Sequence, residues 1–229
     1  MIKKIDNFKS LSALSFIAVV TIYPVLTLPA MIGLLMDHAE MTSFSAGWVV
    51  AIGTFSTATA GFLMSMRIDK QNIKGLCRVA LVIAILMDLI SAFTANMIIV
   101  VFLVRILWGL AMGVAHASSI SSIAHYENFK HGYGLYVGLQ FIVSGLGLYL
   151  VPVYSDLIGV EGFFITFVIM DLIALYLTKF FKGIADLSSV LWDHFNANNC
   201  LESHIYKKPF IMEDNLGVNR NKGKILVPT

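Results

Sequence analysis

The chain has 229 residues, of which 58% are hydrophobic and only 13% are charged, and its mean hydropathy is +0.80. Average soluble domains carry about twice that charged fraction, so the composition excludes an ordinary soluble domain and indicates a membrane protein. The net charge is +2, and the Lys and Arg residues are spread along the chain, which excludes a nucleic-acid-binding surface.

Six apolar stretches follow one another, each long enough to cross ~30 Å of hydrocarbon as a helix that rises ~1.5 Å per residue. They cover residues 11–36, 45–66, 76–94, 97–118, 133–154 and 162–181. The first stretch is too long for the apolar part of a signal peptide, and no cleavage site follows it, so we expect it to be retained. The gap between Thr94 and Met97 is so short that the third and fourth helices must be antiparallel neighbours.

Basic residues occur only in alternate gaps between these stretches, and cytoplasmic loops are the ones that hold excess Lys and Arg. This pattern predicts six helices with both termini in the cytoplasm. The basic residues are Lys3, Lys4, Lys9, Arg67, Lys70, Lys74, Arg78, Lys130, Lys179 and Lys182, whereas the other gaps hold only Asp37, Glu40, Asp156 and Glu161.

The chain therefore divides into a cytoplasmic arm (1–10), a six-helix transmembrane bundle (11–182) and a polar cytoplasmic tail (183–229). In the tail, apolar residues recur at helical spacing. Residues 184–195 are predicted to form an amphipathic helix at the membrane interface, or else a frayed extension of the sixth helix. The repeating residues are Ile184, Leu187, Leu191 and Phe195.

Nothing in the sequence indicates an enzyme, a metal site or a cofactor. Cys77 and Cys200 both fall on the predicted cytoplasmic side, where a disulfide is not expected, and they lack the spacing of a metal or redox motif. The serines near His116 and His125 form no catalytic triad and mark the end of a helix at the membrane surface.

Three ionised side chains lie inside predicted spans. At ~1.5 Å per residue, Asp88 is roughly 9 Å below the outer end of its helix, Arg105 roughly 12 Å and Asp171 roughly 13.5 Å. An isolated charge in a span costs at least ~2.5–3.5 kcal/mol, so partners are expected. We predict that Arg105 pairs with Asp88 or Asp171, either as a pair that responds to a proton or substrate or as a static bridge between helices.

The fourth helix carries a mixed face of candidate cavity residues. Arg105, Gly109, Met112 and His116 lie at i, i+4, i+7 and i+11, which is one side of a helix. His116 is a candidate for protonation near neutral pH, or else an interfacial histidine capped by the serines that follow it. Gly109 and Gly113 form a small-x-x-x-small pair, which is typical of close helix packing.

The first and fifth helices add further candidates. Tyr23 and Pro24 lie at mid-membrane, and with Pro29 they predict a bent first helix that serves a gate or is a packing kink. In the fifth helix, Tyr136, Gln140 and Ser144 are spaced at i, i+4 and i+8. A polar stripe in a span faces protein or water, so we expect it to line a cavity or, as an alternative, to make hydrogen bonds between helices.

Two of these regions carry local motifs, and a third motif begins the sixth helix. The loop after the second helix resembles a motif in which a small residue is followed by three spacers, Asp, a basic residue, a spacer, Gly and a basic residue. The matching residues here are Ser65, Asp69-Lys70, Asn72 and Lys74. Asn72 stands in the Gly position, where Asn tolerates a positive φ. The run Arg105-Ile-Leu-Trp108-Gly109-Leu-Ala111 is similar to Arg-x-x-Gln-Gly-x-Gly, and Gly159-Val-Glu-Gly-Phe-Phe164 is similar to Gly-Trp-Arg-x-x-Phe.

These motifs and the helix count resemble the N-terminal half of a major facilitator superfamily transporter, in particular bacterial drug or sugar efflux permeases. The chain lacks the leading Gly of the loop motif and the Gly-Pro pair of the antiporter signature. The family has twelve helices in two six-helix halves, whereas this chain has six.

The resemblance implies roles for several residues. The fourth helix lines the cavity in this family, which implies that Arg105 binds an anionic substrate or a protonatable carboxylate. The third and sixth helices lie outside the cavity, which favours a static role for Asp88 and Asp171. The loop residues Asp69, Lys70 and Lys74 would close a cytoplasmic gate against the second half, or simply form a solvated basic loop.

The predicted function is secondary active transport of a small solute by alternating access, with proton coupling as one option. Alternating access needs two bundles. The second would be a separately encoded half or a second copy in a homodimer. The alternatives are a truncated, inactive half and a non-transporting membrane assembly protein. The expected location is the lipid of a bacterial inner membrane, as a multi-pass protein.

Overall fold

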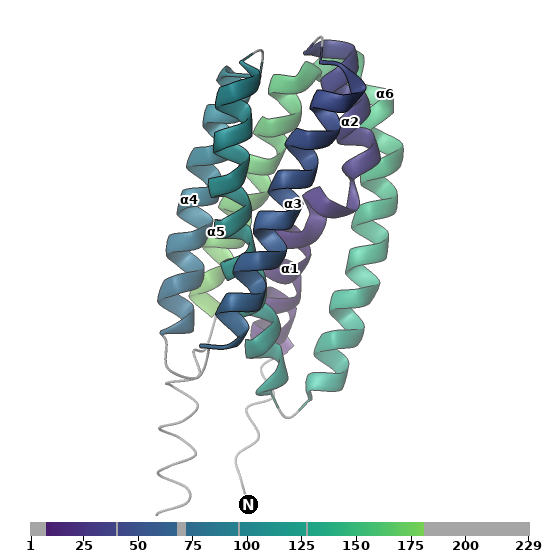
Figure 1. Ribbon diagram of the computed structural model, residues 1–229. Coiled ribbons are helices and arrows are strands. Elements are labelled where there is room, and N and C mark those ends of the chain that lie inside the picture. Colours follow the sequence, from purple (N-terminus) through teal and green to yellow (C-terminus); the bar gives the residue numbers. More distant parts are fainter. Residues whose placement is uncertain (1–7, 40, 68–71, 96, 127, 181–229) are drawn as a thin grey trace, which may run out of the picture. The chain divides into compact units, whose positions relative to one another are not determined.

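The computed structural model describes residues 8–39, 41–67, 72–95, 97–126 and 128–180. In these ranges the chain is all-helical, and six segments are long and apolar enough to cross a membrane, which confirms a multi-pass α-helical membrane protein. The predicted arm lies almost entirely, and the tail with residues 184–195 entirely, outside the described residues. The helices are α1 (Phe8–Leu26), α2 (Leu28–His38), α3 (Ser43–Ser65), α4 (Ile73–Phe93), α5 (Ile98–Ala124) and α6 (Phe129–Leu177), followed by the 3-10 helix η2 (Thr178–Phe180) (Figure 1).

The first span is broken into α1 and α2 at Thr27, whose φ and ψ of −100° and 18° are not helical. Pro29 lies in the first turn of α2, where its missing N–H and its ring prevent the helix from running straight through. The Thr27 backbone N–H and hydroxyl both donate to the Tyr23 carbonyl, each at 3.1 Å, and stabilise the end of α1. The predicted bend in the first helix is therefore present.

The closest helix pair is α3 and α5, which meet through glycines. A Cβ added at Gly109 would overlap the Gly53 carbonyl, and one added at Gly113 would overlap the Thr57 carbonyl. Only residues without a side chain allow the two backbones to approach this closely. Gly109 is thus a packing residue between α3 and α5 rather than part of an open cavity.

The helices α4 and α5 form the predicted antiparallel hairpin, with α4 ending at Phe93 and α5 beginning at Ile98. At its other end, α4 is capped by Asn72, whose side-chain oxygen accepts from the Gly75 N–H at 3.1 Å. The φ of Asn72 is −73°. The expectation of a positive φ there was wrong, because asparagine at this position is an N-cap rather than a substitute for a turn glycine.

The last two predicted spans are the two arms of α6, the first arm (Phe129–Tyr154) and the second arm (Leu157–Phe180). The chain reverses at Gly159, near the start of the second arm, where φ is 57° and ψ is −171°, a conformation that essentially only glycine adopts. The first arm packs on α1, where the Ser15 hydroxyl donates to the Gly132 carbonyl at 3.1 Å. The second arm returns beside α4, and Arg78 Nε donates to the Thr178 hydroxyl at 2.9 Å.

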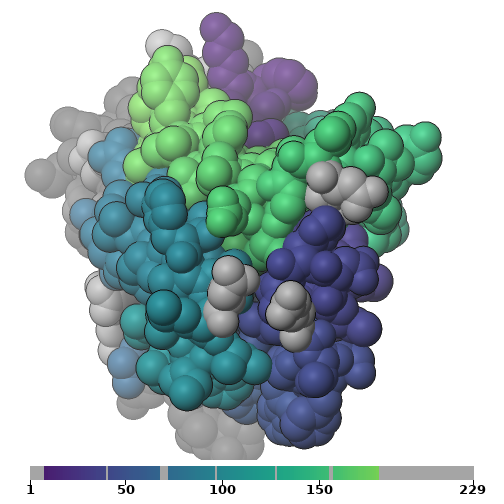
Figure 2. All heavy atoms as spheres, turned by 90° about the horizontal axis from the view of Figure 1, so that it is seen from above, coloured from purple at the N-terminus to yellow at the C-terminus, as the bar shows by residue number. Residues whose placement is uncertain are grey.

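The helix ends separate the charges of the bundle. One end holds the start of α1, the end of α3, the start of α4, the end of α5, the start of α6 and η2 (Figure 1). Six described basic residues of the sequence pattern lie at that end: Lys9, Arg67, Lys74, Arg78, Lys130 and Lys179. Figure 2 looks onto the opposite end, where the blue, teal and green segments come together. Asp37, in the last turn of α2, and Glu161, two residues after Gly159, lie at that end.

Candidate functional site in the membrane-spanning core

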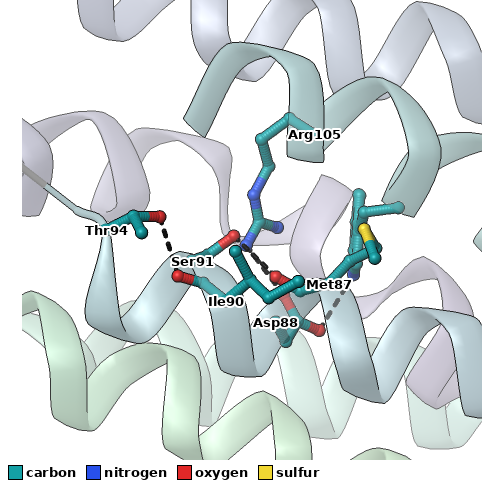
Figure 3. Close-up of polar contacts among 7 residues, drawn as sticks. Met87, Asp88, Ile90, Ser91, Thr94 and Arg105 are labelled. Atoms are coloured by element: carbon teal, nitrogen blue, oxygen red, sulfur yellow. Dashed lines mark hydrogen bonds and ion pairs between the residues drawn. The ribbon is translucent and has the colours of Figure 1, made fainter. Parts of the chain in front are cut away.

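The structure pairs Arg105 of α5 with Asp88 of α4 rather than with Asp171. Arg105 Nη2 donates to Asp88 Oδ1 at 2.8 Å, and the two side chains are 1% and 0% exposed. Figure 3 shows the guanidinium reaching across to the carboxylate. The second carboxylate oxygen, Oδ2, accepts from Trp108 Nε1 at 2.9 Å. Both oxygens of Asp88 are therefore satisfied, as a buried carboxylate requires.

Arg105 is enclosed by aromatic rings and does not line an open cavity. Its guanidinium carbon lies 4.8 Å from the Trp108 ring centroid and 4.5 Å from that of Phe164, both within cation–π range. The Nε and Nη1 atoms have no hydrogen-bond partner in the described part of the chain. A cavity of about 10 Å³, lined in part by Arg105 and Trp108, is the size of a single water site and is too small for a solute.

Asp171 completes what we call the charged layer (Asp88, Arg105 and Asp171). It is 1% exposed, and its Oδ2 has no hydrogen-bond partner among the described residues. It lies close enough to Asp88 and Arg105 for the three charges to interact. Two carboxylates beside one guanidinium can change their total charge by gaining or losing a single proton.

The remaining residues of the predicted α5 face do not form one cavity wall. Met112 is 1% exposed and belongs to the core between α1, α4 and α5. His116 is half-buried against α1, and its Nδ1 lies 3.1 Å from the Thr21 hydroxyl and 3.2 Å from the Ala18 carbonyl. The expectation that Ser118 and Ser119 cap His116 was wrong. The Ser118 hydroxyl has no hydrogen-bond partner among the described residues, and Ser119 donates its hydroxyl to the Ala115 carbonyl of its own helix.

The polar stripe of the first arm (Tyr136, Gln140 and Ser144) is half-buried along its length. Ser144 donates to the Gln140 carbonyl, and the Tyr136 ring lies 6.1 Å from the His116 ring. The Gln140 carboxamide makes no hydrogen bond to any described residue. His116 of α5 and Tyr136 of the polar stripe are thus neighbours, as is expected of two residues that line one cavity.

Two other predicted sites have different outcomes. Tyr23 lines a cavity of about 430 Å³ between α1 and the two arms of α6. Lys74 is half-buried in the first turn of α4, whereas Asp69 and Lys70 lie outside the described residues, so the gate loop stays a prediction. In the described ranges, no group of three or more His, Cys, Asp or Glu residues could hold a metal ion.

Sequence reasoning missed Trp108 as a functional partner and treated it only as a replacement in a motif. The signal was available, because an indole N–H inside a span needs an acceptor and Trp108 follows Arg105 by three residues, on the same side of α5. The nearest buried acceptor was the carboxylate that Arg105 was already expected to bind.

Comparisons with known proteins add no assignment. A scan against protein-family models finds no match for this chain, and neither do searches of curated proteins and of solved structures. The family resemblance rests on the residues quoted above.

Proposed function

We propose that the chain is a half-transporter that moves a small solute by alternating access together with a second six-helix bundle. The observation that carries this proposal is Gln140. A carboxamide without a protein partner is costly in hydrocarbon, where each unmet polar group loses several kcal/mol. Gln140 therefore favours a face that borders water or a second protein wall. His116 and Tyr136 extend the polar surface beside it.

The charged layer supports the same proposal. Ionisable residues inside spans mark solute or proton pathways in many membrane proteins. Asp88 and Arg105 are joined by a hydrogen-bonded ion pair and have the character of a static bridge between α4 and α5. Asp171 is the member without a hydrogen bond to any residue that the structure describes, and we assign it the proton-responsive role in this proposal.

The membrane orientation belongs to the proposal as well. All the basic residues of the pattern that are described lie at one end of the bundle, which the positive-inside rule places in the cytoplasm. Both termini are then cytoplasmic, and a bacterial inner membrane is the location that fits.

A second copy of the chain is the partner that the exposed helix faces favour. On α3, large residues alternate with small ones along an exposed seam of seven-residue spacing. Trp48, Phe55 and Phe62 are 54%, 69% and 66% exposed, and the exposed Ala51 and Ala58 lie between them. The α3 seam thus offers aromatic projections separated by shallow gaps.

The first arm of α6 carries the complementary seam. Phe141 and Leu148 are 73% and 41% exposed, and Gly138 and Gly145 precede them at the same spacing with open space around each Cα. The first arm runs antiparallel to α3 (Figure 1). In a two-fold dimer, Phe55 of one copy would then oppose Gly145 of the other.

The four large aromatics of the two seams expose on the order of 500 Å² per copy, taking ~150–250 Å² for each aromatic. A two-fold dimer would cover roughly 1,000 Å² from these side chains alone, the minimum for a specific interface. The same seams also favour the second candidate function, a membrane assembly protein that does not transport.

The first test is the mass of the detergent-solubilised protein, with bound detergent subtracted. A dimer, or a co-purifying six-span chain, supports the proposal, whereas a clean monomer contradicts it. Gly145→Leu should yield monomer, and Gly33→Leu, which also has open space around its Cβ position but lies in α2 outside both seams, is the matched control.

The second test is flux through the dimer in liposomes loaded with the pH dye pyranine. Ethidium and lactose serve as probes under an imposed proton gradient. We expect transport of one of the two probes to dissipate the proton gradient. Gln140→Leu should abolish this dissipation and leave the mass of the solubilised dimer unchanged. A stable dimer without flux of either probe would favour the assembly function.

A further inference from the structure

A lateral groove separates the two arms of α6 and lies on the opposite side of the first arm from its exposed seam. The groove has a volume of about 430 Å³, within the ~300–1,000 Å³ range of small-molecule sites. The first arm contributes Leu146 and Leu150, the second arm contributes Phe163 and Phe167, and α1 contributes Tyr23.

The burial of the lining residues gives the groove a floor and an open side. On the floor, Phe163, Phe167 and Tyr23 are 1%, 2% and 6% exposed. On the rim, Leu146 and Leu150 are 54% and 40% exposed. Since both arms are membrane-spanning segments, the open side faces the hydrocarbon of the bilayer. A molecule dissolved in the membrane can enter without crossing water.

The Tyr23 hydroxyl is the polar group on the groove floor, whereas the hydroxyls of Tyr154 and Thr166 belong to exposed residues of the lining. The Tyr23 ring is fixed edge-on to Phe167, with centroids 5.7 Å apart, and a Cβ added at Gly147 would overlap its hydroxyl. Within the described ranges this hydroxyl has no hydrogen-bond partner, although the residue is almost fully buried. The hydroxyl oxygen is not one of the fully enclosed polar atoms, so it opens into the groove. A polar group that meets hydrocarbon without a hydrogen-bond partner costs roughly 1–3 kcal/mol, so an acceptor at this point would be stabilising.

The charge and depth of the groove restrict what the acceptor can be. None of the described side chains that line the groove is charged, so an ionised ligand would lie there without a counter-charge. Tyr23 lies midway between Phe8 at the start of α1 and His38 at the end of α2, which places it near the membrane centre. Phospholipid ester groups lie at the interface, about 15 Å from that depth, so a lipid chain offers no acceptor to Tyr23.

We propose that this groove binds a neutral, apolar molecule that carries one hydrogen-bond acceptor, such as a ketone or quinone carbonyl, and that Tyr23 donates to that acceptor. The site is separate from the polar stripe and from the charged layer. Ligand binding in this groove does not depend on whether the chain transports a solute.

The test uses the full chain in phosphatidylcholine nanodiscs, with empty nanodiscs to subtract partitioning into lipid. The probes are 2-undecanone and undecane, which differ only by the carbonyl oxygen. One neutral hydrogen bond corresponds to about two- to tenfold in affinity, so we expect the ketone to bind that much more tightly than the alkane. We also expect the carbonyl infrared band of bound 2-undecanone to shift to lower frequency.

Tyr23→Phe should remove both the preference and the infrared shift, while retaining alkane binding. Tyr149→Phe, which changes a 70% exposed tyrosine on the outer side of the first arm, should leave both unchanged. Leu150→Trp should block both probes. If ketone and alkane bind equally, or if the preference for the ketone persists in Tyr23→Phe, Tyr23 does not recognise a carbonyl. The groove would then bind only apolar chains such as those of lipids. Absence of binding by either probe would refute the site altogether.

Discussion

The two buried aspartates of the charged layer should lose stability to very different extents when each is replaced by asparagine. Asp88→Asn removes the carboxylate that binds Arg105 at 2.8 Å and leaves the guanidinium buried without an anionic hydrogen-bond partner. Asp171→Asn neutralises a carboxylate that makes no hydrogen bond in the described part of the chain. Both sites are at most 1% exposed, so burial alone does not distinguish them.

The magnitudes follow from what each substitution leaves behind. Removing one partner of a buried ion pair costs ~3–5 kcal/mol, because the remaining charge is left buried and unpaired. The cation–π contacts of Arg105 with Trp108 and Phe164 are present before and after the substitution, so they do not change this cost. We therefore expect Asp88→Asn to lower the free energy of unfolding by about 3–5 kcal/mol. Asp171→Asn removes both an attraction to Arg105 and a repulsion from Asp88, so its effect should stay within ~1 kcal/mol.

Reversible unfolding in bicelles, followed by tryptophan fluorescence at neutral pH, measures these free energies. Combining Asp88→Asn with Arg105→Met should recover part of the loss, because no buried cation is then left unpaired. Equal losses at the two aspartates, or a larger loss at Asp171, would refute the assignment of Asp88 as the structural partner of Arg105.

Three further predictions test the packing of the bundle. Gly109→Ala overpacks the contact with α3 and should lower the stability measured by thermal unfolding by ~1–3 kcal/mol. The control Gly134→Ala, which has open space around its Cβ position, should not lower it. Similar losses in the two variants would contradict the close α3–α5 contact. Gly159→Ala at φ 57° should cost about 1–2 kcal/mol, and an unchanged melting temperature would argue against the tight reversal. In a Cys200→Ser variant, N-ethylmaleimide should modify the fully buried Cys77 only after denaturation, and mass spectrometry measures this modification. Rapid labelling of the folded protein would show that Cys77 is accessible.

The spans could be predicted from sequence because length and hydropathy alone decide whether a helix fits a membrane. The Pro29 break and the short turn after Thr94 were equally local signals. The depths of Asp88 and Arg105 were predictable for the same reason, since a helix rises by a fixed distance per residue. Depth does not say which neighbour a side chain faces, and so both aspartates remained candidates.

The features that the sequence did not predict depend on how the helices pack. The enclosure of Arg105 requires Phe164 from a helix that is distant in sequence. The groove at Tyr23 depends on the separation of the two arms of α6, which is set by Gly159 and by contacts with α1. Periodicity places residues on a face, but the partner of that face is decided by the rest of the bundle. This is why Gly109 and Met112, predicted to line a cavity with Arg105, are packed in helix contacts instead.

The position of the Asp88–Arg105 pair also bears on how the chain enters the membrane during synthesis. Alone, α4 would bring in an unpaired anion and α5 an unpaired cation, each at a cost of ~2.5–3.5 kcal/mol or more. The two helices are joined by a short turn, so they can insert together as a hairpin whose charges neutralise each other. Asp171 belongs to the last span and arrives after its neighbours are in place. The order of the helices along the chain thus lowers the barrier to placing three ionisable groups in hydrocarbon.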